Sequence, residues 1–361
     1  MGKIAKEEYV RDSNVDSDDH QDKKLKKLID KVLDSVEGVQ LGNDAPVVNW
    51  LSTGNFALNK IISGDFNKGF PFKRIVDIFG VQSSGKSMIL YHALAEVQKL
   101  GGLASLDDIE RSYMPNFGAK IGIDNSELFL FQDKCSVTVE EHFERMFLEY
   151  VDDSKKKRKG IVPMILDQNP ACPIVVALDS LAALSTRHEK EVLLEKPDMT
   201  KAKVIRAALR IITEVVGRGN VLYLIANHIT DNVGVLYGPK KTTPGGSAVP
   251  FYASVRLELS KTVQVQPEDS LKVIGVDLGV YTSKNKVAPP FREATIRALF
   301  DSGIDPHSGL LDVMVDDSIV VAETDKGGKR TGTYSFGEEK FTKKTFGEFL
   351  LSHPQILGLN K

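Results

Sequence analysis

Short apolar runs alternate with helical patterns over most of this chain. Five of the runs are almost wholly apolar and indicate buried strands, at residues 75–80, 102–107, 128–132, 174–180 and 221–227. Strands that are apolar on both faces are typical of a parallel sheet covered by helices on both sides. Residues 251–259 and 294–300 alternate apolar and polar positions, which predicts later, partly exposed strands. We therefore predict an α/β fold with a mostly parallel central sheet.

The two ends of the chain differ from this central pattern. Residues 1–22 are polar and charged and predict a mobile tail. Residues 23–46 predict an amphipathic helix and a linker, with one apolar stripe made of Leu25, Leu28, Ile29, Val32, Leu33 and Val36. That stripe needs a surface, either in the same chain or in a neighbouring subunit. We place the core at 47–305 and a small C-terminal region, with one short helix, at 306–361.

Composition excludes some classes of protein. The chain has 361 residues, 42% of them hydrophobic, and its apolar runs are too short for a membrane span. Two cysteines do not make a disulfide framework, so we expect a location in a reducing cytoplasm. A net charge of -2 means that any nucleic-acid binding must come from a local basic surface. The charge run at 152–160 indicates a solvated loop rather than a localisation signal.

The segment GVQSSGKS at 80–87 fits the phosphate-loop pattern G-x-x-x-x-G-K-[ST] in full. A strand precedes it and a helical pattern follows, as a phosphate site at a helix N-terminus requires. We expect Lys86 to reach the β- and γ-phosphates of ATP and Ser87 to hold Mg²⁺. The predicted nucleotide contacts are Gly80, Val81, Gln82, Ser83, Ser84, Gly85, Lys86, Ser87 and Met88.

Acidic residues follow two of the predicted strands. Asp179 ends the run IVVALD, where an acid helps to hold Mg²⁺ in phosphate-loop proteins, although a lone Asp there can also be a turn residue. Glu110 follows the strand at 102–107 and is placed to orient water for attack on the γ-phosphate. Its neighbours Asp107 and Asp108 compete for this role, and sequence spacing does not choose among the three.

A long loop follows the last of the five apolar strands. Residues 227–246, NHITDNVGVLYGPKKTTPGG, lack an apolar pattern and contain four glycines, two prolines and a pair of lysines. A loop of this length in a compact domain is usually functional or disordered. The pattern alone does not say which.

These segments together resemble the RecA family of DNA recombinases. The run STGNFALNKIISGDFNKGFPFKRIVDIFGVQSSGKS resembles the start of the RecA ATPase core, and LDSLAAL, GVLYGPKKTTPGGSAVPFYASVRLEL and SKNKVAPPF resemble later RecA segments in the same order. PDMTKAK and IANHIT are similar to the phage UvsX-type branch. The likeness covers about three quarters of the chain and implies a RecA-like ATPase core.

The resemblance assigns roles around the nucleotide. It selects Glu110 as the residue that activates water, because a Gly-Ile-Asp follows twelve residues later, as in the family. It places Phe117 and Phe300 beside adenine and His228 at the γ-phosphate sensor, where bacterial RecA has glutamine. Alone, His228 would be an ordinary histidine at a strand end.

The resemblance also implies a polymer. Lys284 and Lys286 match paired lysines that reach into the neighbouring subunit's ATP site and stabilise the transition state, although alone they would be a solvated strand end. The loop after His228 matches the second DNA-binding loop, and the segment after Asp179 matches the first. The implied DNA contacts are Met199, Lys201, Lys203, Arg206, Val233, Gly234, Val235, Tyr237, Lys240, Lys241, Gly245 and Gly246.

We therefore expect an ATP- and Mg²⁺-dependent recombinase that forms helical filaments on single-stranded DNA and exchanges strands with homologous duplex DNA. The resemblance further implies single-strand-binding and loader proteins as partners, and the cytoplasm of a bacterium or a phage-infected bacterium as the location. The alternatives are a ring-forming RecA-like motor or helicase and a weakly hydrolysing recombination mediator. The chain departs from bacterial RecA at Thr230 and Asn232, which are basic there, at Met114, where an acid contacts adenine, and in its short C-terminus without an acidic tail.

Overall fold

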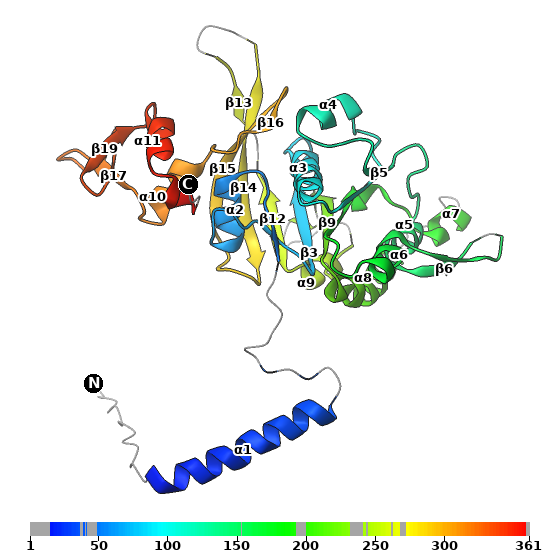
Figure 1. Cartoon of the computed structure of the whole chain (residues 1–361). Coiled ribbons are helices and arrows are strands. Elements are labelled where there is room, and N and C mark those ends of the chain that lie inside the picture. Colours follow the sequence, from blue (N-terminus) through cyan, green and yellow to red (C-terminus); the bar gives the residue numbers. More distant parts are fainter. Residues whose placement is uncertain are drawn as a thin grey trace, which may run out of the picture. The chain divides into compact units, whose positions relative to one another are not determined.

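The structure is a computed structural model, shown in Figure 1. It describes residues 15–36, 39, 41, 49–152, 154–192, 200–231, 241–242, 245–260, 263–267 and 272–358. The chain divides into two compact units, Met1–Val47 and Val48–Lys361. Among the described residues, no helix is both long and apolar enough to cross a bilayer.

The described part of the first unit contains the helix α1 (Val15–Ser35), which begins eight residues before the predicted start at 23. The apolar stripe is largely exposed, with Leu25 and Leu28 exposed by 56% and 58%. Its partner surface, in the same chain or in a neighbouring subunit, stays a prediction.

The second unit is built on a sheet of ten strands, counted over the described residues. Its strand order is β16-β15-β14-β12-β3-β9-β8-β4-β5, and β13 pairs with β14. The parallel strands are β3 (Arg74–Gly80), β4 (Leu103–Asp108), β5 (Leu128–Phe131), β8 (Ile174–Asp179), β9 (Val221–His228) and β12 (Val255–Leu259). The antiparallel strands are β13 (Val263–Val265), β14 (Gly275–Asn285), β15 (Glu293–Leu299) and β16 (Gly303–Ile304). The predicted α/β class with a mostly parallel sheet is confirmed.

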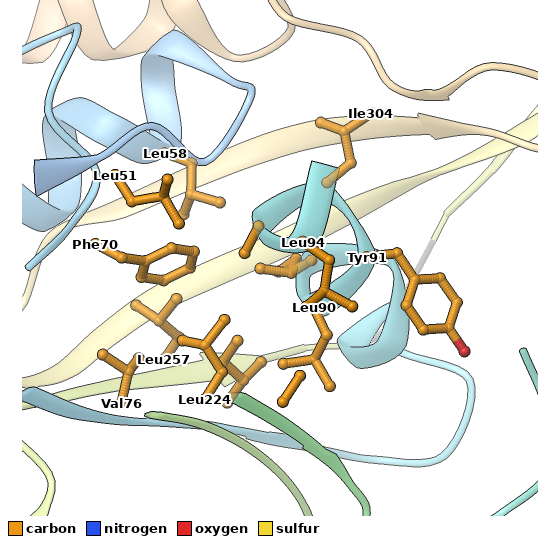
Figure 2. Packing of buried hydrophobic residues seen from close by; sticks show 14 of the residues in the cluster. Leu51, Leu58, Phe70, Val76, Leu90, Tyr91, Leu94, Leu224, Leu257 and Ile304 are labelled. Carbon is orange, nitrogen blue, oxygen red and sulfur yellow. The ribbon is translucent and has the colours of Figure 1, made fainter. Parts of the chain in front are cut away.

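Helices cover both faces of the parallel strands. Successive residues of a strand point to opposite faces of the sheet, so each strand contributes side chains to both layers. Val76 and Ile78 enter one core cluster and Ile75 enters the other. The first cluster includes residues of α2 (Phe56–Ser63), α3 (Lys86–Lys99) and the edge of α4 (Pro115–Lys120). Figure 2 shows this cluster, in which Leu90 and Leu94 of α3 lie over Leu224 and Leu257 of the sheet. The second includes residues of α5 (Val139–Phe147), α6 (Ile161–Gln168), α8 (Lys201–Arg218) and α9 (Ala248–Tyr252).

Shorter elements connect these layers. The charge run at 152–160, predicted as a plain loop, contributes one strand of an exposed antiparallel hairpin. Its register pairs Glu149 with Lys159, so opposite charges face each other across the strands. The remaining connecting elements are β1 (Trp50–Leu51), β2 (Phe70–Pro71), β6 (Glu149–Val151), β7 (Lys157–Lys159), η2 (Leu181–Ala183), α7 (Arg187–Val192), β10 (Thr230–Asp231) and β11 (Lys241–Thr242).

The C-terminal region has its own apolar cluster, in which the rings of Phe341 and Phe349 stack with centroids 4.1 Å apart. It contains α11 (Phe346–Ser352), the one short helix that the sequence predicts near the end, and also a second helix, α10 (Leu310–Asp316), and a three-stranded sheet that we did not predict. The elements are α10 (Leu310–Asp316), β17 (Val321–Thr324), β18 (Arg330–Phe336), β19 (Glu339–Thr342), α11 (Phe346–Ser352) and η3 (Pro354–Leu357).

Candidate functional site

The phosphate loop connects the end of β3 to the start of α3. Gly85 caps the helix with φ of 84° and Ser83 also has a positive φ, 59°, so the chain turns sharply before Lys86. A side chain at Gly80 would place its Cβ 2.5 Å from the Leu259 carbonyl oxygen and 2.8 Å from Ser84 Oγ. Only glycine fits there, and the N–H groups of the first turn of α3 have no partner inside the helix. The loop therefore has the geometry of an anion site.

Lys86 lies folded against this loop. Its Nζ donates to the carbonyl oxygens of Val81 at 2.9 Å and Gly80 at 3.4 Å, and the side chain is almost fully buried. Burial lowers the pKa of Lys86, while Asp179 and Glu110 oppose this effect. Of the other predicted nucleotide contacts, Val81, Gln82 and Ser83 are exposed, Ser84 is buried, and Ser87 and Met88 are half-buried.

Asp179 lies at the carboxyl end of β8, directly opposite Asp108 of β4. It is 1% exposed, and its Oδ2 has no hydrogen-bond partner within the described residues. Burial raises its pKa to about 6, against the opposing effect of a hydrogen bond with Ser87. A buried carboxylate oxygen without a partner, beside a hydroxyl, is a set of hard oxygen donors. Asp179 and Ser87 therefore fit Mg²⁺.

The three carboxylates that compete in the sequence have different surroundings. Asp107 is buried and accepts from His142 Nδ1 at 2.8 Å and from the Ser136 N–H at 3.0 Å. Asp108 is also buried and accepts from the backbone N–H of Tyr113 at 2.8 Å and from Gln132 Nε2 at 3.0 Å. Both side chains are thus committed to internal contacts.

Glu110, by contrast, is 37% exposed, and the charge of Lys86 in the phosphate loop lowers its pKa. Its Oε1 accepts from the Ser180 hydroxyl and lies 2.9 Å from His228 Nε2. Burial raises the pKa of Glu110, but the bonds from Ser180 and His228 and the charges of His228 and Lys86 bring it below its ordinary value. Glu110 is therefore ionised at neutral pH and able to accept a proton.

Ser180 was missed by the sequence reasoning, although its position directly after Asp179 is the signal that could have found it. Its hydroxyl connects the end of β8 to Glu110 after β4. The N–H of Ile109 also donates to the Asp179 carbonyl at 2.7 Å. Hydrogen bonds thus connect the segment of Asp179, the metal-binding candidate, to the segment of Glu110, the water-activating candidate.

The two predicted adenine contacts lie on separate elements. Phe117 belongs to α4, is half-buried and packs against the first core cluster. Phe300 follows β15, is 54% exposed, and its N–H donates to the Ile274 carbonyl. No ring contact joins the two in the part of the chain that the structure describes.

Lys284 and Lys286 lie toward the start of β12, whereas Gly80, the first residue of the phosphate loop, lies beside Leu259 at the end of that strand. Lys284 is opposite Arg256 in β12, and its Nζ donates to the carbonyl oxygens of Pro250 at 2.5 Å and Phe251 at 3.1 Å. From β14 to β4, which leads to Glu110, the sheet order has five steps of about 4.8 Å, or roughly 24 Å. No lysine side chain covers that distance, so Lys284 does not reach Glu110 of its own chain.

The first DNA-binding candidates lie at the start of α8. Lys203 and Arg206 are exposed, whereas Lys201 donates to the carbonyl oxygens of Ala182, at 3.0 Å, and Leu184. Lys201 would have to leave these carbonyls to meet a DNA phosphate. Met199 lies outside the described residues.

The loop after His228 is described at its two ends. Residues 230–231 pair with 241–242, which brings Lys241 opposite Asp231. Gly245 and Gly246 have φ of 90° and 59°, and a Cβ on Gly245 would lie 3.2 Å from Ile205 of α8. These glycines let the loop return against α8. The candidates Val233, Gly234, Val235, Tyr237 and Lys240 lie outside the described residues.

Comparison with known proteins places this chain in a family. A family model of the RecA N-terminal domain matches residues 22–305. The chain is 32% identical to Protein RecA of Treponema denticola over 328 residues, which cover 88% of this chain and 72% of the relative. It is 33% identical to Protein RecA of Levilactobacillus brevis over 341 residues, or 93% and 81% of the two chains. It is 32% identical to Protein RecA of Thioalkalivibrio sulfidiphilus over 349 residues, which cover 93% of this chain and 92% of the relative. The chain therefore belongs to the RecA family, and it is a RecA-type recombinase and a DNA-dependent ATPase.

Proposed function

We propose that this recombinase hydrolyses ATP with Glu110 as the general base, while it forms a filament on single-stranded DNA that pairs with homologous duplex DNA. The observation that supports the base most directly is the contrast among the three carboxylates. Asp107 and Asp108 are buried and hydrogen-bonded. Glu110 is partly exposed and ionised, and the charge of Lys86 lowers its pKa. A base must reach the attacking water, and only Glu110 among the three has that access.

The chain's own residues divide the work of phosphoryl transfer. Glu110 takes the proton of the attacking water, and Ser180 and His228 hold its carboxylate in place. Lys86 exchanges the carbonyls of Gly80 and Val81 for phosphate oxygens. Ser87 and Asp179 would hold Mg²⁺, which would neutralise charge on the phosphate oxygens.

Lys284 and Lys286 complete the site of the next subunit in the filament. Their distance from Glu110 in the same chain supports a role in trans, and Lys286 is exposed at the end of β14. There they stabilise the charge that develops on the transferred phosphoryl group, as an arginine finger does. This arrangement makes hydrolysis depend on polymerisation, which disfavours the mediator alternative with little hydrolysis.

The two loops beside the site bind DNA. Lys203 and Arg206 on α8 and Lys241 at the second loop supply positive charge for phosphates, which positions the strand without reading its sequence. The second loop begins at His228, whose ring touches Glu110. Nucleotide at Glu110 and DNA at the loop therefore act on the same residue. The histidine at this position also supports the phage UvsX-type branch, with single-strand-binding and loader proteins as partners.

The test replaces Glu110 with glutamine, which keeps the shape of the side chain and removes the base. In the Glu110→Gln variant, ATP turnover on single-stranded DNA should fall by about 100- to 10,000-fold. Nucleotide and DNA binding should survive, and electron microscopy should show filaments in the presence of ATP. The matched control is Glu348→Gln in the C-terminal region, which should hydrolyse ATP as the wild type does.

Two outcomes would contradict the proposal. Normal turnover in Glu110→Gln would exclude this residue as the base. Rings in place of filaments on single-stranded DNA would favour a ring-forming motor instead.

A further inference from the structure

A second hydrogen-bonded cluster lies inside the sheet layer, and the chemistry above does not use it. Asp107 Oδ2 lies 2.8 Å from His142 Nδ1, and His142 Nε2 lies 2.9 Å from the Tyr223 hydroxyl. All three side chains are completely buried. A carboxylate only accepts, so Nδ1 carries the proton, and in the neutral ring Nε2 then accepts from the tyrosine hydroxyl. Each member is thus oriented by the next.

The cluster connects two strands that do not pair with each other. Asp107 belongs to β4 and Tyr223 to β9, and β8 runs between them. The register places Asp107 beside Leu178 and Tyr223 beside Val176. His142 comes from α5 and crosses over β8, covering two strand spacings, or about 10 Å.

Aromatic rings close the cluster off from water. The ring centroids of Phe147 and Tyr223 are 4.9 Å apart, and those of His142 and Phe143 are 5.3 Å apart. A buried polar group without a hydrogen-bond partner is costly in such surroundings. The side chains of Asp107, His142 and Tyr223 therefore keep the one arrangement in which each is hydrogen-bonded. Apolar residues of the same shape would fill this space without fixing the distance or the rotation of the two strands.

The two connected strands carry the residues of the proposed hydrolysis. Glu110 follows Asp107 by three residues, and His228 follows Tyr223 by five at the end of β9. Beyond the strand ends these two side chains meet, with Oε1 and Nε2 2.9 Å apart. The cluster and the Glu110–His228 pair are therefore two connections between the same two strands, one inside the core and one at the site.

We propose that Asp107, His142 and Tyr223 are positioning residues, which set the placement of Glu110 relative to His228 and so to the attacking water. This inference rests on the proposed role of Glu110. Displacing a reacting group by about 1 Å can reduce the rate by roughly 100-fold, so a small relaxation of β4 against β9 affects turnover strongly. Binding of nucleotide depends on the phosphate loop between β3 and α3, which the cluster does not touch.

The experiment removes one hydroxyl from the cluster. Tyr223→Phe keeps the ring and its aromatic contacts and loses only the bond to His142. We expect kcat for ATP on saturating oligo(dT) to fall by about 10-fold, while KM and the affinity for a fluorescent ATP analogue stay within about 2-fold. His142→Phe removes both bonds and should reduce kcat further. Tyr334→Phe, in the C-terminal region, is the matched control and should match the wild type.

A double-mutant cycle separates positioning from simple structural support. If the cluster acts through the Glu110 carboxylate, adding Tyr223→Phe to Glu110→Gln should leave the residual turnover unchanged. If Tyr223→Phe reduces turnover by the same factor in the wild-type protein and in Glu110→Gln, the inference is overturned. An unchanged kcat with a lowered melting temperature in Tyr223→Phe would also overturn it. Normal turnover of Glu110→Gln alone would instead overturn the proposed base, and this inference with it.

Discussion

Asp179 should destabilise the folded protein at neutral pH when neither Mg²⁺ nor nucleotide is bound. Its carboxyl is 1% exposed, and one oxygen has no hydrogen-bond partner among the described residues. Burial raises its pKa from the ordinary 3.8 to about 6. The folded state thus keeps this proton over a range of pH in which the unfolded chain has already released it.

The size and direction of the effect follow from linkage. Below pH 3.8 the carboxyl is protonated in both states and has no effect. As the pH rises to about 6 the unfolded state is favoured progressively, and the full penalty is about 3 kcal/mol. About 2 kcal/mol of this develops between pH 4.5 and 7.5. The wild type therefore loses stability as pH rises, relative to a variant that cannot ionise.

Asp179→Asn is that variant. Asparagine leaves its own amide imperfectly paired, but that cost does not change with pH. The difference in free energy of unfolding between variant and wild type therefore isolates the carboxyl. Urea unfolding in EDTA, without nucleotide, should show this difference moving in favour of the variant by about 2 kcal/mol from pH 4.5 to 7.5.

The nucleotide-bound protein provides the second half of the test. Mg²⁺ with a slowly hydrolysed ATP analogue should raise the melting temperature of the wild type more than that of Asp179→Asn, because only the carboxylate compensates the metal charge. A stability difference that is flat across pH would refute the assigned burial of the charge. Equal stabilisation of both proteins by Mg²⁺ and nucleotide would refute the metal role.

Two further predictions concern the phosphate loop and the subunit interface. Gly80→Ala should abolish tight nucleotide binding, measured by fluorescence titration, because its Cβ would lie 2.5 Å from the Leu259 carbonyl oxygen; wild-type affinity would contradict the geometry. Lys284→Ala with Lys286→Ala should reduce ATP turnover on single-stranded DNA by at least 10-fold with unchanged thermal stability. Mixing this variant with excess Glu110→Gln should recover activity, since each lacks a different half of a shared site; no recovery in mixed filaments would argue against action in trans.

Local pattern was sufficient for most of the core. The apolar runs at 75–80, 102–107 and 174–180 predicted strands that the structure confirms, because short, continuous apolar runs are typical of strands buried on both faces. The phosphate loop was also predictable, since its glycines and lysine act within one contiguous segment. The C-terminal sheet was not predicted, because β17–β19 are short, largely exposed and lack a continuous apolar run.

Choices among neighbouring residues needed the fold. The sequence places Asp107, Asp108 and Glu110 within four positions and offers no physical reason to prefer one. The structure separates them, because Asp107 meets His142 and Asp108 meets the Tyr113 N–H, leaving Glu110 open.

The sequence by itself determined the class of fold, the phosphate loop and the resemblance to RecA, because each depends on residues close together in the chain. Only the tertiary structure decided that Glu110 meets His228, 118 positions away, and that Lys284 lies five strand positions from the strand that leads to Glu110. Strand order and register set these distances. They depend on how the whole sheet packs, and no local pattern records them.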